Sequence, residues 1–156
     1  MSFGGDRLLL LDIGSGTQDV LYVLPGQEPS NWPKFVLPAP ARGVARRIRQ
    51  LTAQGRDIYL SGTNMGGGFA QALSEHLSTG RRAAAHPDAA LALADDLSLV
   101  EAMGVQLADI CPTGHATVRL ADFEPGFWQA FLAAAGLEQP DAVAACAQDH
   151  GFHPGK

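Results

Sequence analysis

Residues 8–23, with the sequence LLLLDIGSGTQDVLYV, constrain the fold more than any other part of the chain. Two short apolar runs flank a turn that contains Gly14, Gly16 and Thr17, and the first run ends in Asp12. Short runs of Leu, Ile and Val around a glycine-containing turn predict two adjacent antiparallel strands. A carboxylate at a strand end, followed by glycines, can also place backbone N–H groups and a cation-attracting oxygen beside one phosphate group.

The same turn has a purely structural explanation. In a tight hairpin, glycine supplies backbone conformations with positive φ, while Asp and Thr side chains form local hydrogen bonds. The segment is not a Walker A loop, because no Gly-Lys-Ser/Thr follows the glycines. It is not a dinucleotide-binding fingerprint either, because the glycines lead into a strand. The residues of the turn are therefore compatible with both a phosphate site and a structural hairpin.

Composition limits the size and the setting of the protein. A chain of 156 residues that is 46% hydrophobic predicts one single-core domain and is too short for two well-developed lobes. The net charge of -5 argues against general binding to nucleic acid or to anionic membranes. The sequence has no apolar run near 20 residues and no signal-peptide pattern at its start, which predicts a soluble, cytoplasmic protein. Cys111 and Cys146, without a C-x-x-C pattern, fit buried, reduced thiols.

Hydrophobic periodicity predicts an alternation of strands and helices after the opening hairpin. The predicted strands lie at 7–13, 20–24, 34–37, 57–60 and 142–147, and we number them one to five. The predicted helices lie at 41–53, at about 69–77 and after Pro125. The segment 79–122 is predicted to hold a short strand at 83–86, a helix within 88–103 and a strand at 117–120, and it is a candidate insertion.

This order of elements predicts an α/β layered fold in which strands four and five join the sheet through right-handed crossovers. The expected strand order is 3-2-1-4-5. The carboxyl ends of strands one, four and five would then share one edge of the sheet, where open α/β sheets bind their ligands. The loops 14–17, 62–68 and 148–153 are therefore expected to converge.

A second glycine-rich loop, SGTNMGGG at 61–68, leads into the helix at 69–77. Backbone amides of Gly66 to Gly68 at a helix N-terminus would form an anion site, with Thr63 and Asn64 as polar contacts to the ligand. The alternative is a flexible connection in which glycine only permits close packing. The residues slightly favour this alternative.

Other polar and aromatic groups have more ordinary explanations. Asp149, His150 and His153 could form a metal site with Asp12, although an exposed tail explains them better. Arg42, Arg46, Arg47 and Arg49 fit a solvated helix face, with a partner-binding surface as the alternative. The stripe of Phe127, Trp128 and Phe131 is expected in the core. His76, His86 and His115 have no spaced partner, so we assign them no role.

Asp12, Gly14, Ser15, Gly16, Thr17 and Asp19 resemble the first phosphate motif of the actin, heat-shock chaperone and sugar-kinase ATPase superfamily. The phrases DIGSGTQDVLY and QDHGF are similar to those of one uncharacterised family within that group, labelled as related to pyruvate formate-lyase activating enzyme. The resemblance implies a ribonuclease-H-like three-layer fold, with a mixed sheet and helices on both of its faces. It covers 1–156 as a single first lobe, with an insertion at about 79–122.

The resemblance also implies roles for individual residues. Asp12 would lie close to a hydrated Mg²⁺, and the amides of Ser15, Gly16 and Thr17 would surround phosphate groups of ATP. Gly14, Gly66 and Gly67 complete the implied phosphate-binding set. Gln148 or Asp149 would orient the attacking water or substrate hydroxyl, which makes them the implied catalytic residues together with Asp12.

The chain departs from the superfamily pattern because a second phosphate motif and an adenosine motif are both absent; these belong to a second lobe. The expected function is therefore the N-terminal, phosphate-binding lobe of an actin-like ATPase or kinase of unknown substrate, incomplete as a catalyst alone. ATP and Mg²⁺ would be its cofactors, and a second lobe or another copy of the chain its partner. The alternative is a noncatalytic ribonuclease-H-like association module. A nuclease is disfavoured because strand four ends in Ser61 and Gly62 instead of an acid.

Overall fold

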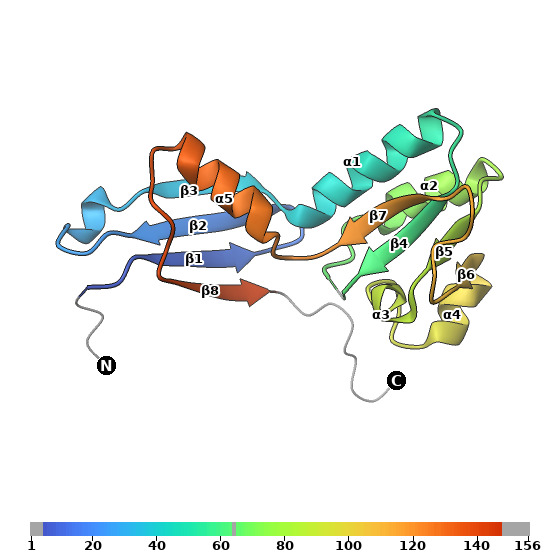
Figure 1. Cartoon of the computed structure of the whole chain (residues 1–156). Coiled ribbons are helices and arrows are strands. Elements are labelled where there is room, and N and C mark those ends of the chain that lie inside the picture. Colours follow the sequence, from blue (N-terminus) through green and yellow to red (C-terminus); the bar gives the residue numbers. More distant parts are fainter. Residues whose placement is uncertain (1–4, 64, 148–156) are drawn as a thin grey trace.

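The computed structural model of the chain describes residues 5–63 and 65–147. These residues form an α/β structure with two four-stranded sheets that lie side by side (Figure 1). The first sheet is mixed and has the strand order β3-β2-β1-β8, whereas the second is parallel and has the order β6-β5-β4-β7. The chain crosses between them twice, after β3 and after β7 (Figure 1).

The first sheet is built from both ends of the sequence. Its opening part comprises β1 (Leu8–Ile13), β2 (Thr17–Val23), the short helix η1 (Pro29–Asn31) and β3 (Lys34–Pro38). Its closing part comprises α5 (Pro125–Ala134) and β8 (Ala142–Ala147). Alternate side chains of β1 and β2 point to one face of the sheet. This face packs against α5 in a hydrophobic core of Leu9, Leu11, Ile13, Val20, Tyr22, Trp128 and Leu132.

A group of polar contacts holds β8 against the start of β1. The Arg7 amide donates to Asp141 Oδ2 at 2.8 Å, and the Asp141 amide donates to the Arg7 carbonyl at 2.8 Å. The Arg7 guanidinium also pairs with the carboxylates of Asp141 and Glu138. The Tyr22 hydroxyl donates to the Glu138 carbonyl at 2.8 Å. These contacts fix the position at which the C-terminal strand joins the sheet.

The second sheet and its helices come from one continuous stretch of chain. In order, this stretch contains α1 (Pro40–Ala53), β4 (Ile58–Gly62), α2 (Ala70–Ser78), β5 (Ala83–Ala85), α3 (Pro87–Ala90), α4 (Leu97–Ala102), β6 (Val105–Leu107) and β7 (Ala116–Leu120). It has its own hydrophobic core, in which Ile48 of α1, Leu60 of β4 and Leu120 of β7 have no exposed surface. Each sheet therefore has a separate core.

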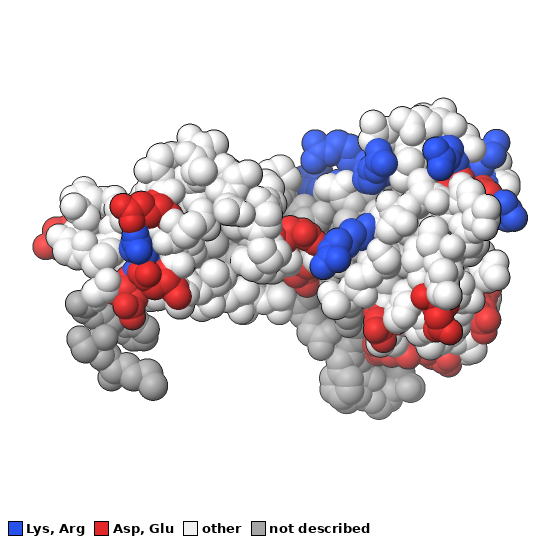
Figure 2. Space-filling view, in the orientation of Figure 1, with Lys and Arg blue, Asp and Glu red and all other residues white. Residues whose placement is uncertain are grey.

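Helix α1 has the two faces that its sequence predicts. Val44, Ile48 and Leu51 are buried, whereas Arg42 and Arg49 are exposed. The arginines of α1 contribute to the basic area at the upper edge of the molecule (Figure 2). The amphipathic pattern thus directs one side of the helix to the second core and leaves the other in solvent.

The observed strand order corrects the expected order 3-2-1-4-5. Strands three, two and one are adjacent as expected, but β8 lies beside β1, and strand four is β4 of the second sheet. Ile58, Tyr59 and Leu60 are all buried, and β4 has a parallel neighbour on each side. An apolar run indicates that a strand is buried on both faces. It does not indicate which strand lies beside it.

The strand at 142–147 has its predicted bounds, but it is exposed, so Cys146 is not the buried thiol that was expected. All six residues of β8 are exposed, because β8 has β1 as its only described neighbour. The expectation that helices cover both faces of the sheet does not hold for the first sheet. Helix α5 covers one face, and no described helix covers the other, where Val36 is 67% exposed.

The segment 79–122 contains more elements than its sequence pattern predicts. The predicted helix within 88–103 is divided into α3 and α4, and β6 follows them without having been expected. Each of these elements has only three to six residues. A periodic pattern needs a longer run before it can be recognised.

Candidate functional site

The turn between β1 and β2 does not need glycine for its backbone conformation. Neither Gly14 nor Gly16 has a positive φ, so the structural explanation based on left-handed conformations does not apply to them. The Gly14 amide donates to the Thr17 carbonyl at 3.0 Å and closes the turn. A Cβ atom at Gly14 would lie 3.2 Å from that carbonyl oxygen, whereas one at Gly16 would meet no atom within 4 Å.

The second glycine loop approaches this turn directly. A Cβ atom at Gly68 would lie 3.1 Å from the Ser15 carbonyl oxygen and 3.1 Å from the Cβ atom of Ala41 in α1. The Ala39 amide, just before α1, donates to the Gly16 carbonyl at 3.1 Å. The expected convergence of the loops 14–17 and 62–68 is therefore found at Gly68, although the strands that carry the two loops belong to different sheets.

Several backbone amides in this region have no hydrogen-bond acceptor within the described part of the chain. These are the amides of Ser15 and Gly16 in the turn and of Gly67 and Gly68 in the second loop. The Gly66 amide donates to Asp122 Oδ1 at 3.4 Å. Neighbouring unpaired N–H groups form a concentration of positive partial charge, which suits an anion such as phosphate.

Asp12 lies on the uncovered face of the first sheet and is exposed. It is directly opposite Asp19 of β2 and beside Cys146 of β8. Two carboxylates in opposite positions repel one another, so a cation near them would be stabilising. Among residues 5–63 and 65–147, no cluster of three or more His, Cys, Asp or Glu could hold a metal ion. A hydrated Mg²⁺ with one carboxylate ligand remains the prediction for Asp12.

The predicted catalytic residues Gln148 and Asp149 lie outside the described residues, as do Asn64, His150 and His153. The end of β8 is nevertheless informative. Because β8 is parallel to β1 and Ala147 pairs with Ile13, both strands end at the same edge of the sheet. The turn 14–17 and the end of β8 therefore lie at the same edge of the sheet.

His76 and the aromatic residues of α5 differ in how far they are buried. His76 is fully buried, and its ring nitrogens contact Thr52 Oγ1 at 2.8 Å and the Arg82 carbonyl at 3.1 Å, so it is a core residue with hydrogen-bond partners. Trp128 is buried as expected, whereas Phe127 is 48% exposed and lines a pocket beside α5. The sequence did not predict this pocket.

A model of the family described as "Putative pyruvate format-lyase activating enzyme (DUF1786)" matches residues 65–156, which is more than half of the chain. The chain belongs to this family. The DUF1786 match confirms the resemblance to that uncharacterised family, and it includes the QDHGF phrase but not residues 8–23. It does not extend to the wider ATPase superfamily.

Searches among curated proteins and among solved structures found no match to this DUF1786 member. None of its described helices combines the length and the apolar character needed to cross a membrane.

Proposed function

We propose that the edge formed by the turn 14–17 and the segment 66–68 binds the phosphate groups of a nucleotide. The observation that carries this proposal is the approach of Gly68 to the Ser15 carbonyl, which brings together the amides of the two loops that have no acceptor among the described residues. A Cβ at residue 68 would be closer to the Ser15 carbonyl oxygen than side chains usually come, so the two loops would have to move apart by a few tenths of an ångström. The chain is, in this proposal, the first lobe of an actin-like ATPase or kinase.

The topology of the first sheet supports the same proposal. A ribonuclease-H-like lobe has three antiparallel strands followed by a strand that returns through a helix and lies parallel to the first. Here β1, β2 and β3 are antiparallel, and α5 leads into β8, which is parallel to β1. In this interpretation β8 is the fourth strand of the lobe, and the stretch from α1 to β7 is an insertion longer than the expected 79–122.

The proposed roles follow from position along this edge. Asp12 attracts Mg²⁺, the amides of Ser15 and Gly16 contact phosphate oxygens, and Gln148 or Asp149 orients the attacking group beyond the end of β8. Phosphoryl transfer depends on positioning and on charge stabilisation from both sides of the nucleotide. Because this edge supplies one side, we propose that a second lobe or another copy of the chain supplies the other.

We do not propose the activity that the family description names, because the sequence lacks the cysteines for an iron–sulfur cluster that could support radical chemistry. Such clusters are held by several cysteine thiolates, commonly four. This sequence has two cysteines, Cys111 and Cys146, and they belong to different parts of the fold.

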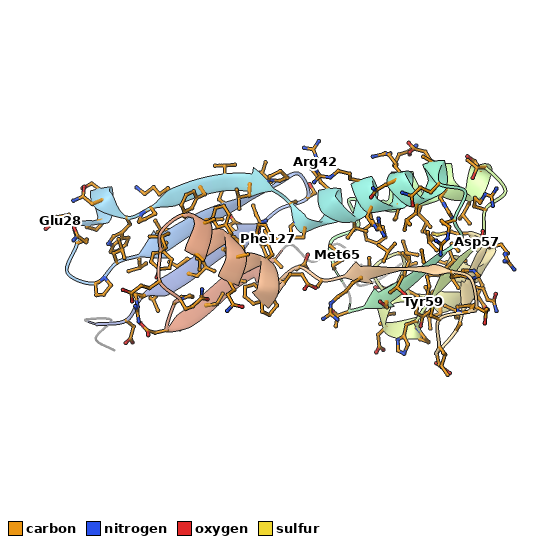
Figure 3. The ribbon with its side chains drawn as sticks, turned by 45° about the horizontal axis from the view of Figure 1, so that its top comes forward. Glu28, Arg42, Asp57, Tyr59, Met65 and Phe127 are labelled. Carbon is orange, nitrogen blue, oxygen red and sulfur yellow. The ribbon has the colours of Figure 1, made fainter. Side chains whose placement is uncertain are left out.

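Thermal unfolding with and without ATP and Mg²⁺ tests the proposal. A ligand that binds only the folded state at tenfold its Kd adds about 1.4 kcal/mol, which raises the Tm of a chain of this size by about 3–5 °C. We expect Asp12→Ala to abolish this shift and Glu28→Ala, which removes an exposed carboxylate at the far end of the first sheet (Figure 3), to preserve it. The absence of a shift at millimolar ATP, even with a second lobe supplied, would contradict the proposal.

A second function, as a noncatalytic association module, is favoured by the uncovered face of the first sheet. A shallow hollow of about 740 Å³ on this face is lined by apolar residues that include Leu10, Leu21, Val36 and Ala144. The outer edge of β8 pairs with no other described strand. Exposed apolar surface and unpaired strand edges are the features that proteins use to associate.

A further inference from the structure

A pocket of about 510 Å³ lies at the junction of the two sheets, between α1, α5 and the connection that follows β7. Its volume is in the range of pockets that bind small molecules. Phe127, which contributes to its wall, lies near the middle of the molecule, close to where the chain crosses between the sheets (Figure 3). Neither the sequence motifs nor the proposed phosphate site accounts for this pocket.

One polar side-chain atom in the pocket wall lacks a hydrogen-bond partner among the described residues. Gln18 lines the pocket and is 4% exposed; its Nε2 donates to the Pro38 carbonyl at 3.1 Å, while its Oε1 has no hydrogen-bond partner among the described residues. Exchanging the two amide atoms would not help, because Oε1 would then face the carbonyl of Pro38. A buried acceptor without a donor is costly, so the site favours a ligand that brings an N–H group.

Another part of the pocket wall is aromatic. Phe127 stacks on Phe131 with ring centroids 5.8 Å apart, and it meets Trp128 edge to face at 5.1 Å. All three residues line the pocket, and the Phe127 ring is half-exposed although its neighbours in α5 are packed in the first core. An aromatic group of a ligand would cover this surface in the geometry that aromatic rings prefer.

The charged groups of the pocket carry both signs. Arg119 is already paired with Glu124 at 2.8 Å, and Asp122 uses Oδ1 to accept the Gly66 amide. No ion pair is described for Arg46, and none is described for Asp122 Oδ2. As far as the described residues go, Arg46 and Asp122 Oδ2 are therefore open to a ligand, which suits a molecule that carries both charges.

We propose that this pocket binds a free amino acid with an aromatic side chain. The ring lies against Phe127, the ammonium group donates to Asp122 and to Gln18 Oε1, and the carboxylate faces Arg46. Because Gln18 Oε1 is buried, the amide has to turn toward the cavity to accept from the ammonium group, and its Nε2 then gives up the hydrogen bond to the Pro38 carbonyl. The proposal does not depend on nucleotide binding at the glycine loops.

Calorimetric titration of the full chain tests the proposal with three probes that share a phenyl ring. L-phenylalanine carries both charges, 3-phenylpropionate lacks the ammonium group, and 2-phenylethylamine lacks the carboxylate. We expect L-phenylalanine to bind at millimolar or lower concentration and each of the others to bind about tenfold more weakly, since each loses a hydrogen bond to a charged group.

Two arginines on α1 provide a matched pair of variants. Arg46 lines the pocket, whereas Arg47 bonds to Gln50 on the exposed side of the same helix. Arg46→Ala should weaken L-phenylalanine and 3-phenylpropionate about tenfold and leave 2-phenylethylamine unchanged. Arg47→Ala should change none of the three affinities. Equal effects of the two variants would overturn the assignment of the carboxylate to Arg46.

The variant Gly43→Leu should fill the pocket without destabilising the fold. It lies inside α1 and lines the pocket, and a Cβ atom there would meet no atom within 4 Å. Because glycine is a poor helix former, Gly43→Leu should fold at least as well as the wild type, as judged by circular dichroism and Tm, and should bind none of the probes. Persistent binding in this variant, or no binding of L-phenylalanine to the wild type, would overturn the proposal.

Discussion

Gly16, Gly62 and Gly68 show how differently single glycines contribute to the candidate edge. Gly62 has a φ of +106°, and a Cβ there would collide with the Leu120 carbonyl, so it is required by the packing of β4 on β7. A Cβ at Gly68 would lie 3.1 Å from the Ser15 carbonyl oxygen, so the neighbouring atoms would have to shift by a few tenths of an ångström. Gly16 meets neither condition, because it has no positive φ and a Cβ there would meet no atom within 4 Å.

These differences lead to a prediction at the scale of the residue. Gly68→Ala should lower affinity for ATP and Mg²⁺ by at least tenfold, because its Cβ pushes the second loop away from Ser15. Gly126→Ala is the matched control and should keep the affinity, since its Cβ has free space and the residue belongs to α5 and to neither loop. Titration of both variants with ATP measures the difference. If Gly68→Ala binds as the wild type does, the contact between the loops is not part of the site.

At the scale of the element, Asp57 links the start of β4 to the start of β5. Its carboxylate accepts hydrogen bonds from the Arg82 amide at 3.0 Å and from Arg82 Nε at 2.8 Å. Asp57 lies in the part of the molecule that holds the second sheet (Figure 3). These hydrogen bonds, the backbone one first, hold the pKa of Asp57 below its ordinary value of 3.8. The carboxylate therefore stabilises the fold above pH 3.8 and loses this contribution as the pH falls through its lower folded pKa.

We therefore expect the stability of the wild type to be retained near neutral pH and to decline on acidification below about pH 4. Asp57→Asn should be less stable at neutral pH, and its stability should depend less on pH in the acidic range. Urea unfolding at several pH values provides the measurement, with Asp95→Asn as the exposed control. Parallel pH profiles for Asp57→Asn and the wild type would show that this carboxylate does not contribute.

The elements also show which parts of the structure can be predicted from sequence. The bounds of α1, β1 and β8 agree with the predictions within a residue, because periodicity and helix-ending residues are local signals. The neighbour of β1 and the exposure of β8 could not be predicted, since both depend on segments far apart in the chain. Gln18 did leave a signal: it alternates with the inward-facing Val20 and Tyr22. The sequence could not show that this position faces a pocket at the junction of the two sheets.

At the scale of the whole molecule, the uncovered face of the first sheet predicts association. Val36 lies in the middle of the edge strand β3, is 67% exposed and pairs with Asp19 of β2. Light scattering should show a mass above that of one chain, rising with concentration, and Val36→Lys should shift the protein toward a single chain. Leu99→Lys, which alters an exposed apolar residue of α4 instead, is the control. If the wild type stays monomeric at high concentration, this face does not bind a second copy of the chain.

The contact between Arg7 and Asp141 has a consequence for the order in which the chain folds. These residues are 134 positions apart, so their pairing closes a loop that contains nearly the whole sequence. The stretch from α1 to β7 is continuous and can form its own core beforehand, whereas the first sheet must wait for α5 and β8. Distant contacts form late because their loops are costly to close. During synthesis, β1 to β3 are therefore without α5 and β8 while the second core is being made.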